Sequence, residues 1–214
     1  MRRKSVLFLA LLVSLTIAAS AALADVKLPD PKKDGGDGIF SLLEKRASGS
    51  RGAFPTGKIS PEELSSILWA ASGQNRGGKG WTVPFAGGKP PYVKIYVATP
   101  EGAFLYDWKG HSLTEVTDKN VLPEITQDDF VKQAACVLIL VSDTGDMGRM
   151  SNLNAGNSLA YIATGAMTQN AYLAADALGI SGRYMVSLNA DAVKRELKLN
   201  DTDSPLCIMP LGKN

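Results

Sequence analysis

The amino-acid sequence predicts an α+β domain, in which helices cover a β-sheet. Predicted helices come first along the chain, a three-stranded meander follows, and helices and strands then alternate to the end. The composition of the 214 residues, 45% hydrophobic and 21% charged, is that of a globular protein. A chain of this length suits one domain, and the sequence has no internal repeat.

Residues 1–24 have the three-part pattern of a secretory signal peptide. Three cations at positions 2 to 4 precede an apolar run, and Ala22-Leu23-Ala24 has the small-residue form of a cleavage site. We expect cleavage after Ala24, and hence a periplasmic or secreted protein with no stable membrane insertion; the alternative is an uncleaved membrane anchor. Cleavage leaves 20 basic against 21 acidic residues, so the charge implies no nucleic-acid partner.

The mature chain begins with a polar segment at 25–37, rich in proline and glycine, which predicts a flexible lead-in to a domain at 38–214. A first helix is expected in "GIFSLLEKR", with Ile39, Leu42 and Leu43 on one side. The helix in "SPEELSSILWAASG" has stronger signals. Ser60 and Glu63 form a capping box, the proline suits the first helical position, and Gly73 ends the run.

A long loop at 73–91 is dominated by glycine and proline. Such a segment inside a compact domain is usually functional or disordered. After it we expect strands at 92–98, 103–108 and 112–116, of which the last two are joined by a short turn. A short helix at 128–135 leads to a buried strand at 136–142.

A long helix is expected at 157–178, with Asn157 as its N-terminal cap and Gly179 at its end. Its apolar residues recur at helical spacing: Leu159, Ile162, Ala166, Leu173 and Ala177. Small and polar residues interrupt this surface halfway along, so the helix must lie close to protein or to a ligand. Gln169 and Asn170 provide amide donors and acceptors there, or alternatively satisfy local backbone groups.

The C-terminal part is expected to alternate between strand and helix. We expect a strand at 183–188, a helix at 189–197 capped by Asn189, and a closing strand at 206–212.

The cysteines and the single histidine offer little chemistry. Cys136 and Cys207 lie in predicted buried strands; they could pair in an oxidising compartment, but two small buried hydrophobic residues are the favoured interpretation. His111 lies at a predicted hairpin tip, where a solvated side chain is expected. No group of residues has the spacing of metal ligands.

Two loop segments have residues suited to ligand binding. In "KRASGSRGAF", arginines and serines on a flexible backbone suit a phosphate monoester; a solvated basic loop is the alternative. In "VPFAGG", backbone amides unobstructed by side chains could approach a flat ligand. The aromatic rings of Trp81 and Phe85 either stack on such a ligand or anchor the loop in the core. Since the chain lacks a catalytic triad or a paired-carboxylate cleft, a cofactor would carry the reaction of an enzyme.

These segments together resemble a known family. The arginine–serine segment, "ISPEELSSILWAASGQNR", the proline-centred loop, "VKIYVATPEGAFLYDWKGHSL" and "TGAMTQNAYLAADALGI" occur in this order. The chain is similar, from about Phe40 to its C-terminus, to the FMN-dependent nitroreductase superfamily, and most to its short branch near the azoline oxidases of thiazole/oxazole peptide biosynthesis. The resemblance implies an α+β sandwich with a central mixed or antiparallel sheet, and an obligate homodimer with two FMN sites at the subunit interface.

The resemblance also implies which residues bind FMN. Arg46, Ser48 and Arg51 match the motif for the phosphate and ribityl chain, and Lys213 matches a C-terminal cation near the phosphate. The loop at 84–88 is expected to line the isoalloxazine from the partner, with Arg183 and Tyr184 beside the ring and the long helix nearby. The implied cofactor-binding set is Arg46, Ser48, Arg51, Pro84, Phe85, Ala86, Gly87, Gly88, Gln169, Arg183, Tyr184 and Lys213, with no catalytic side chain and no metal ligand.

The implied function is that of an exported FMN-dependent oxidoreductase, which transfers two electrons as hydride between flavin N5 and a small-molecule or peptide substrate. The sequence departs from the family pattern in two places. One extra residue separates Ser48 from Arg51, and Phe85 stands where a serine is usual after the loop proline. These departures leave an alternative open, a flavin-free family member that acts as a binding or structural dimer.

Overall fold

The computed structural model describes residues 25–34 and 36–214. The predicted signal peptide at 1–24 lies outside the described residues. No helix within the described part of the chain is long and apolar enough to cross a membrane.

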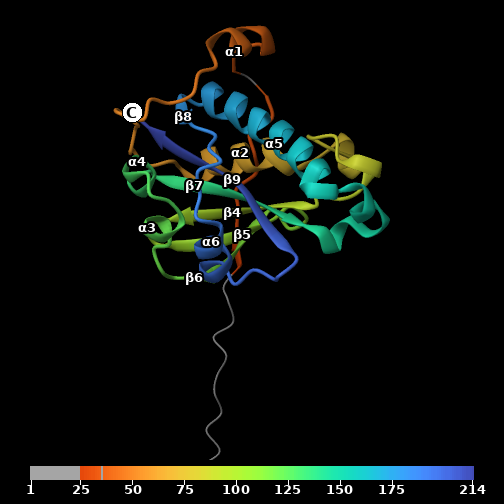
Figure 1. Ribbon diagram of the computed structural model, residues 1–214. Helices are drawn as coiled ribbons and strands as arrows, with labels where there is room; N and C mark the ends of the chain where they lie inside the picture. The colour runs from red at the N-terminus through yellow and green to blue at the C-terminus, as the bar shows by residue number, and fades with distance from the viewer. Residues whose placement is uncertain (1–24, 35) are drawn as a thin grey trace, which may run out of the picture.

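A seven-stranded antiparallel sheet forms the centre of the molecule (Figure 1), in the order β1-β6-β5-β4-β7-β9-β8. Its strands are β1 (Asp25–Lys27), β4 (Val93–Thr99), β5 (Gly102–Asp107), β6 (Ser112–Thr117), β7 (Cys136–Asp143), β8 (Ile180–Gly182) and β9 (Asp203–Lys213). Two further short strands, β2 (Gln74–Asn75) and β3 (Gly80–Trp81), pair with each other in the long loop. The predicted α+β class with an antiparallel sheet is confirmed.

Helices cover both faces of the sheet. The helices are α1 (Ile39–Lys45), α2 (Pro61–Ser72), α3 (Leu122–Ile125), α4 (Asp129–Lys132), α5 (Ser158–Ala177) and α6 (Ala190–Glu196). One core cluster joins α2 and α5 to one face, and a second joins α3, α4 and α6 to the other. Because both faces are covered, every residue of β7 is buried, which explains its nearly unbroken apolar sequence.

The predicted start of α2 is confirmed. The backbone N–H of Glu63 donates to Ser60 Oγ and the backbone N–H of Ser60 donates to the Glu63 carboxylate, which completes the capping box. Of the two asparagine caps predicted for other helices, one is confirmed and one is wrong. Asn189 caps α6 as predicted, whereas Asn157 does not cap α5: it has a left-handed backbone, and the Asn154 side chain accepts from Ala160 N instead.

The predicted apolar stripe of α5 is only partly correct: Leu159 and Ala166 pack against the core, but they lie beside the buried face and not at its centre. Ile162 is 70% exposed and Ala177 is exposed, while the buried face consists of other residues: Ala160, Ala163, Thr164, Met167, Thr168, Ala171, Tyr172 and Ala175. The small alanines allow α5 to lie close against α2 and the sheet. Apolar residues occur on all sides of this helix, so periodicity alone could not select the buried one.

Two segments differ from the sequence prediction at the edges of the sheet. The expected flexible lead-in begins instead with the edge strand β1, which pairs with β6, and Leu28 is buried in the core. The expected strand at 183–188 is absent: β8 lies just before it, and Met185 alone forms a bridge, to Ile208. In α1, only Leu42 is buried, whereas Ile39 and Leu43 are half exposed.

Both cysteines are free and buried. Cys136 lies opposite Leu211 in the β7–β9 ladder, while Cys207 lies opposite Leu140, so the two thiols are four ladder positions apart. Burial raises the pKa of each thiol to about 12. They therefore serve as small core residues, which confirms the favoured interpretation.

Candidate functional site

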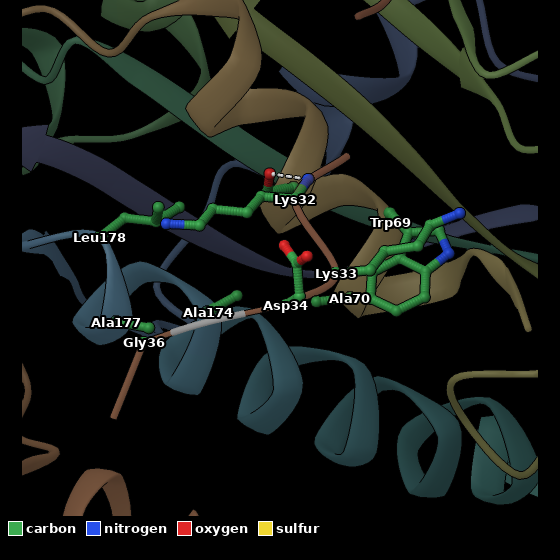
Figure 2. A pocket seen from close by; sticks show the side chains of 10 residues that line it. Lys32, Lys33, Asp34, Gly36, Trp69, Ala70, Ala174, Ala177 and Leu178 are labelled. Atoms are coloured by element: carbon green, nitrogen blue, oxygen red, sulfur yellow. Dashed lines mark hydrogen bonds between the residues drawn. The ribbon is translucent and has the colours of Figure 1, made fainter. Parts of the chain in front are cut away.

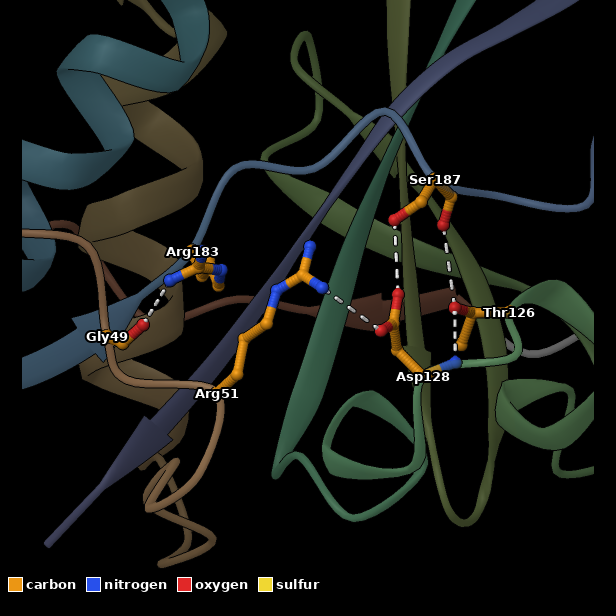
Figure 3. A network of polar contacts seen from close by, with 6 residues as sticks. All are labelled: Gly49, Arg51, Thr126, Asp128, Arg183 and Ser187. Carbon is orange, nitrogen blue, oxygen red and sulfur yellow. Dashed lines mark hydrogen bonds and ion pairs between the residues drawn. The ribbon is translucent and has the colours of Figure 1, made fainter.

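The arginine-containing segment lies along the β8–β9 edge of the sheet. Gly49 N donates to the carbonyl of Gly182 at 2.8 Å, and Arg183 Nη1 donates to the carbonyl of Gly49 at 2.7 Å (Figure 3). Further along, Gly57 and Lys213 exchange two backbone hydrogen bonds, of 2.8 and 3.0 Å. These contacts bring the segment after α1, the segment after α5 and the C-terminus to one place.

Two glycines allow this close approach. A Cβ on Gly212 would lie 1.8 Å from the carbonyl oxygen of Pro55, and a Cβ on Gly57 would overlap the carbonyl oxygen of Lys213. A backbone contact this short excludes any side chain at position 212. The glycines thus hold the arginine segment against the sheet edge.

Tyr172 of α5 is the centre of the polar contacts at this edge. Its hydroxyl lies 3.0 Å from Ser48 Oγ and accepts from the backbone N–H of Tyr184. The guanidinium of Arg46 lies over the Tyr172 ring, 5.2 Å from the centroid. Sequence reasoning missed this tyrosine, although a buried tyrosine on an otherwise apolar helix usually needs a partner for its hydroxyl.

The cations of the site face carboxyl groups of the same chain. Arg51 Nη1 is 3.7 Å from an Asp128 carboxylate oxygen (Figure 3), and Lys213 Nζ donates to Glu63. The hydrogen bond from Lys213 holds the pKa of Glu63 below its usual range. Burial raises the pKa of the Asp176 carboxyl, and the positive charge of Arg46 partly offsets this. The backbones of these cationic residues therefore lie close together, while their charged groups pair with carboxyl groups on different helices and loops.

One donor at this edge has no partner among the described residues. Arg183 Nε is buried without an acceptor, although Nη1 of the same guanidinium is bonded. An unpaired buried donor on a cation is costly, and an oxygen-rich ligand would satisfy it. Together with the serine and arginines nearby, this donor fits the phosphate and ribityl oxygens of FMN.

The loop at 84–88 is built differently. Phe85 is buried, with its ring edge-on to the rings of Trp81 and Tyr92, so it anchors the loop in the core. Ala86 N donates to the Tyr92 hydroxyl at 3.2 Å. Gly87 and Gly88 have φ angles of +66° and +63°, and Gly88 has no atom near its Cβ position. The loop thus presents exposed, side-chain-free backbone from a fixed base.

A single chain does not bring this loop to the arginine segment. The Tyr92 hydroxyl at the loop's base donates to Leu159 O in the first turn of α5, whereas the arginine segment contacts Tyr172, 13 residues further on. That separation corresponds to about 20 Å along the helix. The structure therefore brings together one part of the predicted set (Arg46, Ser48, Arg51, Arg183, Tyr184 and Lys213) and leaves the other part (Pro84, Phe85, Ala86, Gly87 and Gly88) apart from it.

The two amides of α5 have different surroundings. Asn170 donates 3.1 Å hydrogen bonds to the carbonyls of Ala70 and Thr82, so it joins α5 to α2 and the long loop. Gln169 is half-buried, and its side chain makes no hydrogen bond with a described residue. Gly165, one turn before it, is exposed with nothing near its Cβ position. This bare surface is where α5 can accept another molecule.

A pocket of about 190 Å³ lies between the N-terminal segment and helices α2 and α5 (Figure 2). The ammonium of Lys33 lies 5.3 Å from the centroid of the Trp69 ring, and Lys32 N donates to Ser66 Oγ. None of the predicted site residues lines it. Within the described residues, no group of three or more His, Cys, Asp or Glu side chains is placed to hold a metal ion.

Comparison with known proteins identifies the family. The model of the nitroreductase family matches residues 43–213. Many solved structures are similar, among them the following three. A protein of Ralstonia eutropha JMP134 assigned as a nitroreductase is 29% identical, with a TM-score of 0.79 over 88% of this chain and 89% of that one. A nitroreductase-assigned protein of Anabaena variabilis is 19% identical, with a TM-score of 0.70 over 89% of this chain and 42% of that one.

The third similar structure is a chain of the E. coli microcin synthetase McbBCD complex with truncated pro-MccB17 bound. It is 17% identical, with a TM-score of 0.67 over 85% of this chain and 75% of that one. At this identity the likeness shows the fold alone. No curated protein matches the chain.

Proposed function

Because the chain belongs to the nitroreductase family, a family of oxidoreductases, we propose that it is an FMN-dependent oxidoreductase that works as a homodimer. The observation that carries this proposal is the convergence of Arg46, Ser48 and Arg51 with Arg183 and the C-terminal Lys213 at one edge of the sheet. Three parts of the chain far apart in sequence supply a hydroxyl, cations and a buried unpaired donor there. These are the groups that a phosphorylated, hydroxyl-rich ligand needs.

In this proposal Arg46, Ser48, Arg51 and Lys213 hold the phosphate end of FMN, and Arg183 and Tyr184 lie beside the ring system. When bound, FMN supplies two-electron chemistry through hydride transfer at N5. The protein's own part is to orient the ring, to bind the substrate against it, and to exclude water.

The separation of the two halves of the site supports a homodimer. The 84–88 loop lies about 20 Å along α5 from the arginine segment in one chain, so a second copy has to supply it to the same ligand. The exposed apolar residues Leu153, Tyr161 and Ile162 lie in and just before the first turns of α5 and give that copy a surface to cover. In the homodimer, Gln169 and Gly165 would lie at the interface near the flavin.

We further propose that the enzyme is exported and acts on a small-molecule or peptide substrate. Cleavage after Ala24 would leave Asp25, the first residue of the edge strand β1, at the start of the mature chain. Nicotinamide donors are not expected outside the cytoplasm. The electron donor would therefore be another reductant, or the reaction would be an oxidation of the substrate.

The absorption spectrum of the purified protein tests the cofactor. We expect a yellow protein with one FMN per subunit, and a weaker retention of FMN in Arg46→Ala and Arg51→Ala. A colourless dimer that does not bind added FMN would contradict this function, and would favour a flavin-free protein that acts as a binding or structural dimer. Unchanged FMN affinity in both variants would remove the two arginines from the site.

A further inference from the structure

The phosphate end of the proposed site contains carboxyl groups as well as cations. Arg46, Arg51 and Lys213 supply three positive charges there. Facing them are the carboxyl groups of Asp128, Asp176 and Glu63. A phosphate monoester carries a charge of about −1.5 to −2 at pH 7. If all three carboxyl groups are ionised, they cancel the three positive charges, so loss of one carboxylate would leave a net positive charge for the phosphate.

Asp128 differs from Glu63 because its carboxylate caps no helix, and from Asp176 because it forms an ion pair with an arginine of the site. Glu63 completes the capping box of α2, and Asp176 lies on α5 with a carboxylate oxygen buried. Asp128 stands at the N-terminal cap position of α4, but its side chain makes no capping hydrogen bond. Its contact with Arg51 therefore has no part in building an element.

Asp128 is held in place from its other side. Ser187 Oγ donates to Asp128 Oδ2 at 3.1 Å, and Asp128 N donates to Thr126 Oγ1 at 3.1 Å (Figure 3). Arg51, by contrast, is 57% exposed at its side chain, and its only ion pair with a described residue is the one with Asp128, at 3.7 Å. A bound phosphate would thus have to compete for the Arg51 guanidinium with a carboxylate whose position is fixed.

We propose that Asp128 sets the affinity of the site for a phosphorylated flavin, by competing with the phosphate for Arg51. This inference rests on the proposed function and adds to it a residue that the family resemblance does not supply. Asp128 weakens the binding of FMN in two ways: it occupies the guanidinium of Arg51, and it repels the phosphate. It leaves the binding of riboflavin unchanged, because riboflavin has no phosphate.

The test is a titration of the full mature chain with FMN and with riboflavin, followed by the quenching of flavin fluorescence. We expect Asp128→Asn to bind FMN about threefold to tenfold more tightly than the wild type, the range for an exposed ion pair together with the lost repulsion. Riboflavin affinity should be equal in both proteins. In an Arg51→Gln background, Asp128→Asn should increase the FMN affinity much less, because the guanidinium for which Asp128 competes is absent.

Asp129→Asn is the matched control. It removes the same charge one residue away, where the carboxylate is highly exposed and pairs with Lys132. We expect its FMN affinity to equal that of the wild type. If the wild type binds FMN and Asp128→Asn binds it no more tightly, or if Asp129→Asn gains as much, the inference is overturned while the proposed function stands. If none of the proteins binds FMN, the inference fails together with the proposed function.

Discussion

At the scale of single residues, His111 shows how the fold gives a turn residue a structural role. It lies between β5 and β6 with a φ angle of +48°, as a hairpin tip should, but its ring is only partly exposed and both of its nitrogens have protein partners. Its Nε2 lies 2.7 Å from Ser65 Oγ and its Nδ1 lies 2.9 Å from the Tyr106 hydroxyl. Since Ser65 itself donates to Pro29 O, the network joins the hairpin, α2 and the N-terminal segment.

This network requires a neutral imidazole. With Ser65 donating to Pro29 O, Nε2–H donates to Ser65 and Nδ1 accepts from Tyr106, so every polar atom has a partner. Protonation would turn Nδ1 into a donor, so the buried Tyr106 hydroxyl would lose the acceptor of its own O–H. Burial lowers the pKa of His111. The unfolded chain therefore binds a proton more readily than the folded chain as the pH falls below about 6.5.

We predict that His111 makes the protein less stable in mild acid. A depressed folded-state pKa gives stability that is fully present above the unfolded value and is lost as the pH falls toward the folded one. Chemical unfolding should thus give a smaller free energy of unfolding at pH 5.5 than at pH 7.5. His111→Asn, which tolerates the left-handed backbone, should reduce this pH dependence. An equal pH dependence in the two proteins would contradict the role assigned to His111.

The residues of the candidate site were predictable only where a short motif carried them. Arg46, Ser48 and Arg51 stand close together in the sequence and can be recognised together. Tyr172, Asp128 and Ser187 belong to no motif, because the side-chain contacts of Tyr172 with Ser48 and of Asp128 with Ser187 and Arg51 each span 59 or more residues of the chain. Only the fold places them next to the arginine segment.

At the scale of elements, local signals predicted helix ends better than helix faces. The capping box of α2 and the cap of α6 involve residues three positions apart, so the sequence contains all that determines them. The buried face of α5 depends on what packs against it, and alanines on one side compete with larger apolar residues on the other. The sequence prediction placed the larger apolar residues on the buried face. In the structure that face is rich in alanines, because small side chains allow close packing.

The segment that carries the arginines is an element held by backbone contact. Gly212 of β9 lies under Pro55, and the Gly57–Lys213 bridge follows directly. We predict that Gly212→Ala, whose Cβ would overlap the Pro55 carbonyl, lowers the free energy of unfolding by about 1–3 kcal/mol. It should also weaken FMN retention, because the arginine segment loses its support.

Gly52→Ala is the control for that prediction. Gly52 lies in the same segment, has no positive φ angle, and has no atom within 4 Å of its Cβ position. Its free energy of unfolding should stay within about 0.5 kcal/mol of the wild-type value, as urea denaturation can measure. Equal stability of the two variants would show that the close approach of Pro55 is not needed.

At the scale of the whole molecule, the two halves of the proposed site lie at the two ends of α5. The arginine segment contacts the C-terminal half of the helix and the 84–88 loop contacts its start. The helix surface between them includes Gly165, which is exposed and small. A second copy laid along this surface could place its loop near the first copy's arginines, so dimer formation and cofactor binding should depend on each other.

Ile162→Asp tests that dependence. The side chain is 70% exposed in one chain, so the substitution should leave the fold intact while it places a charge in the proposed dimer interface. We expect light scattering after gel filtration to show a monomer, with an unchanged far-UV circular dichroism spectrum and FMN affinity reduced more than tenfold.

Val26→Asp is the control, since Val26 is also exposed, at 51%, but lies on the edge strand β1. It should remain dimeric and retain FMN, because β1 lies at the opposite edge of the sheet from β8. If Ile162→Asp stays dimeric and binds FMN normally, the surface of α5 around Ile162 is not the dimer interface, and the proposed sharing of the site across it is wrong.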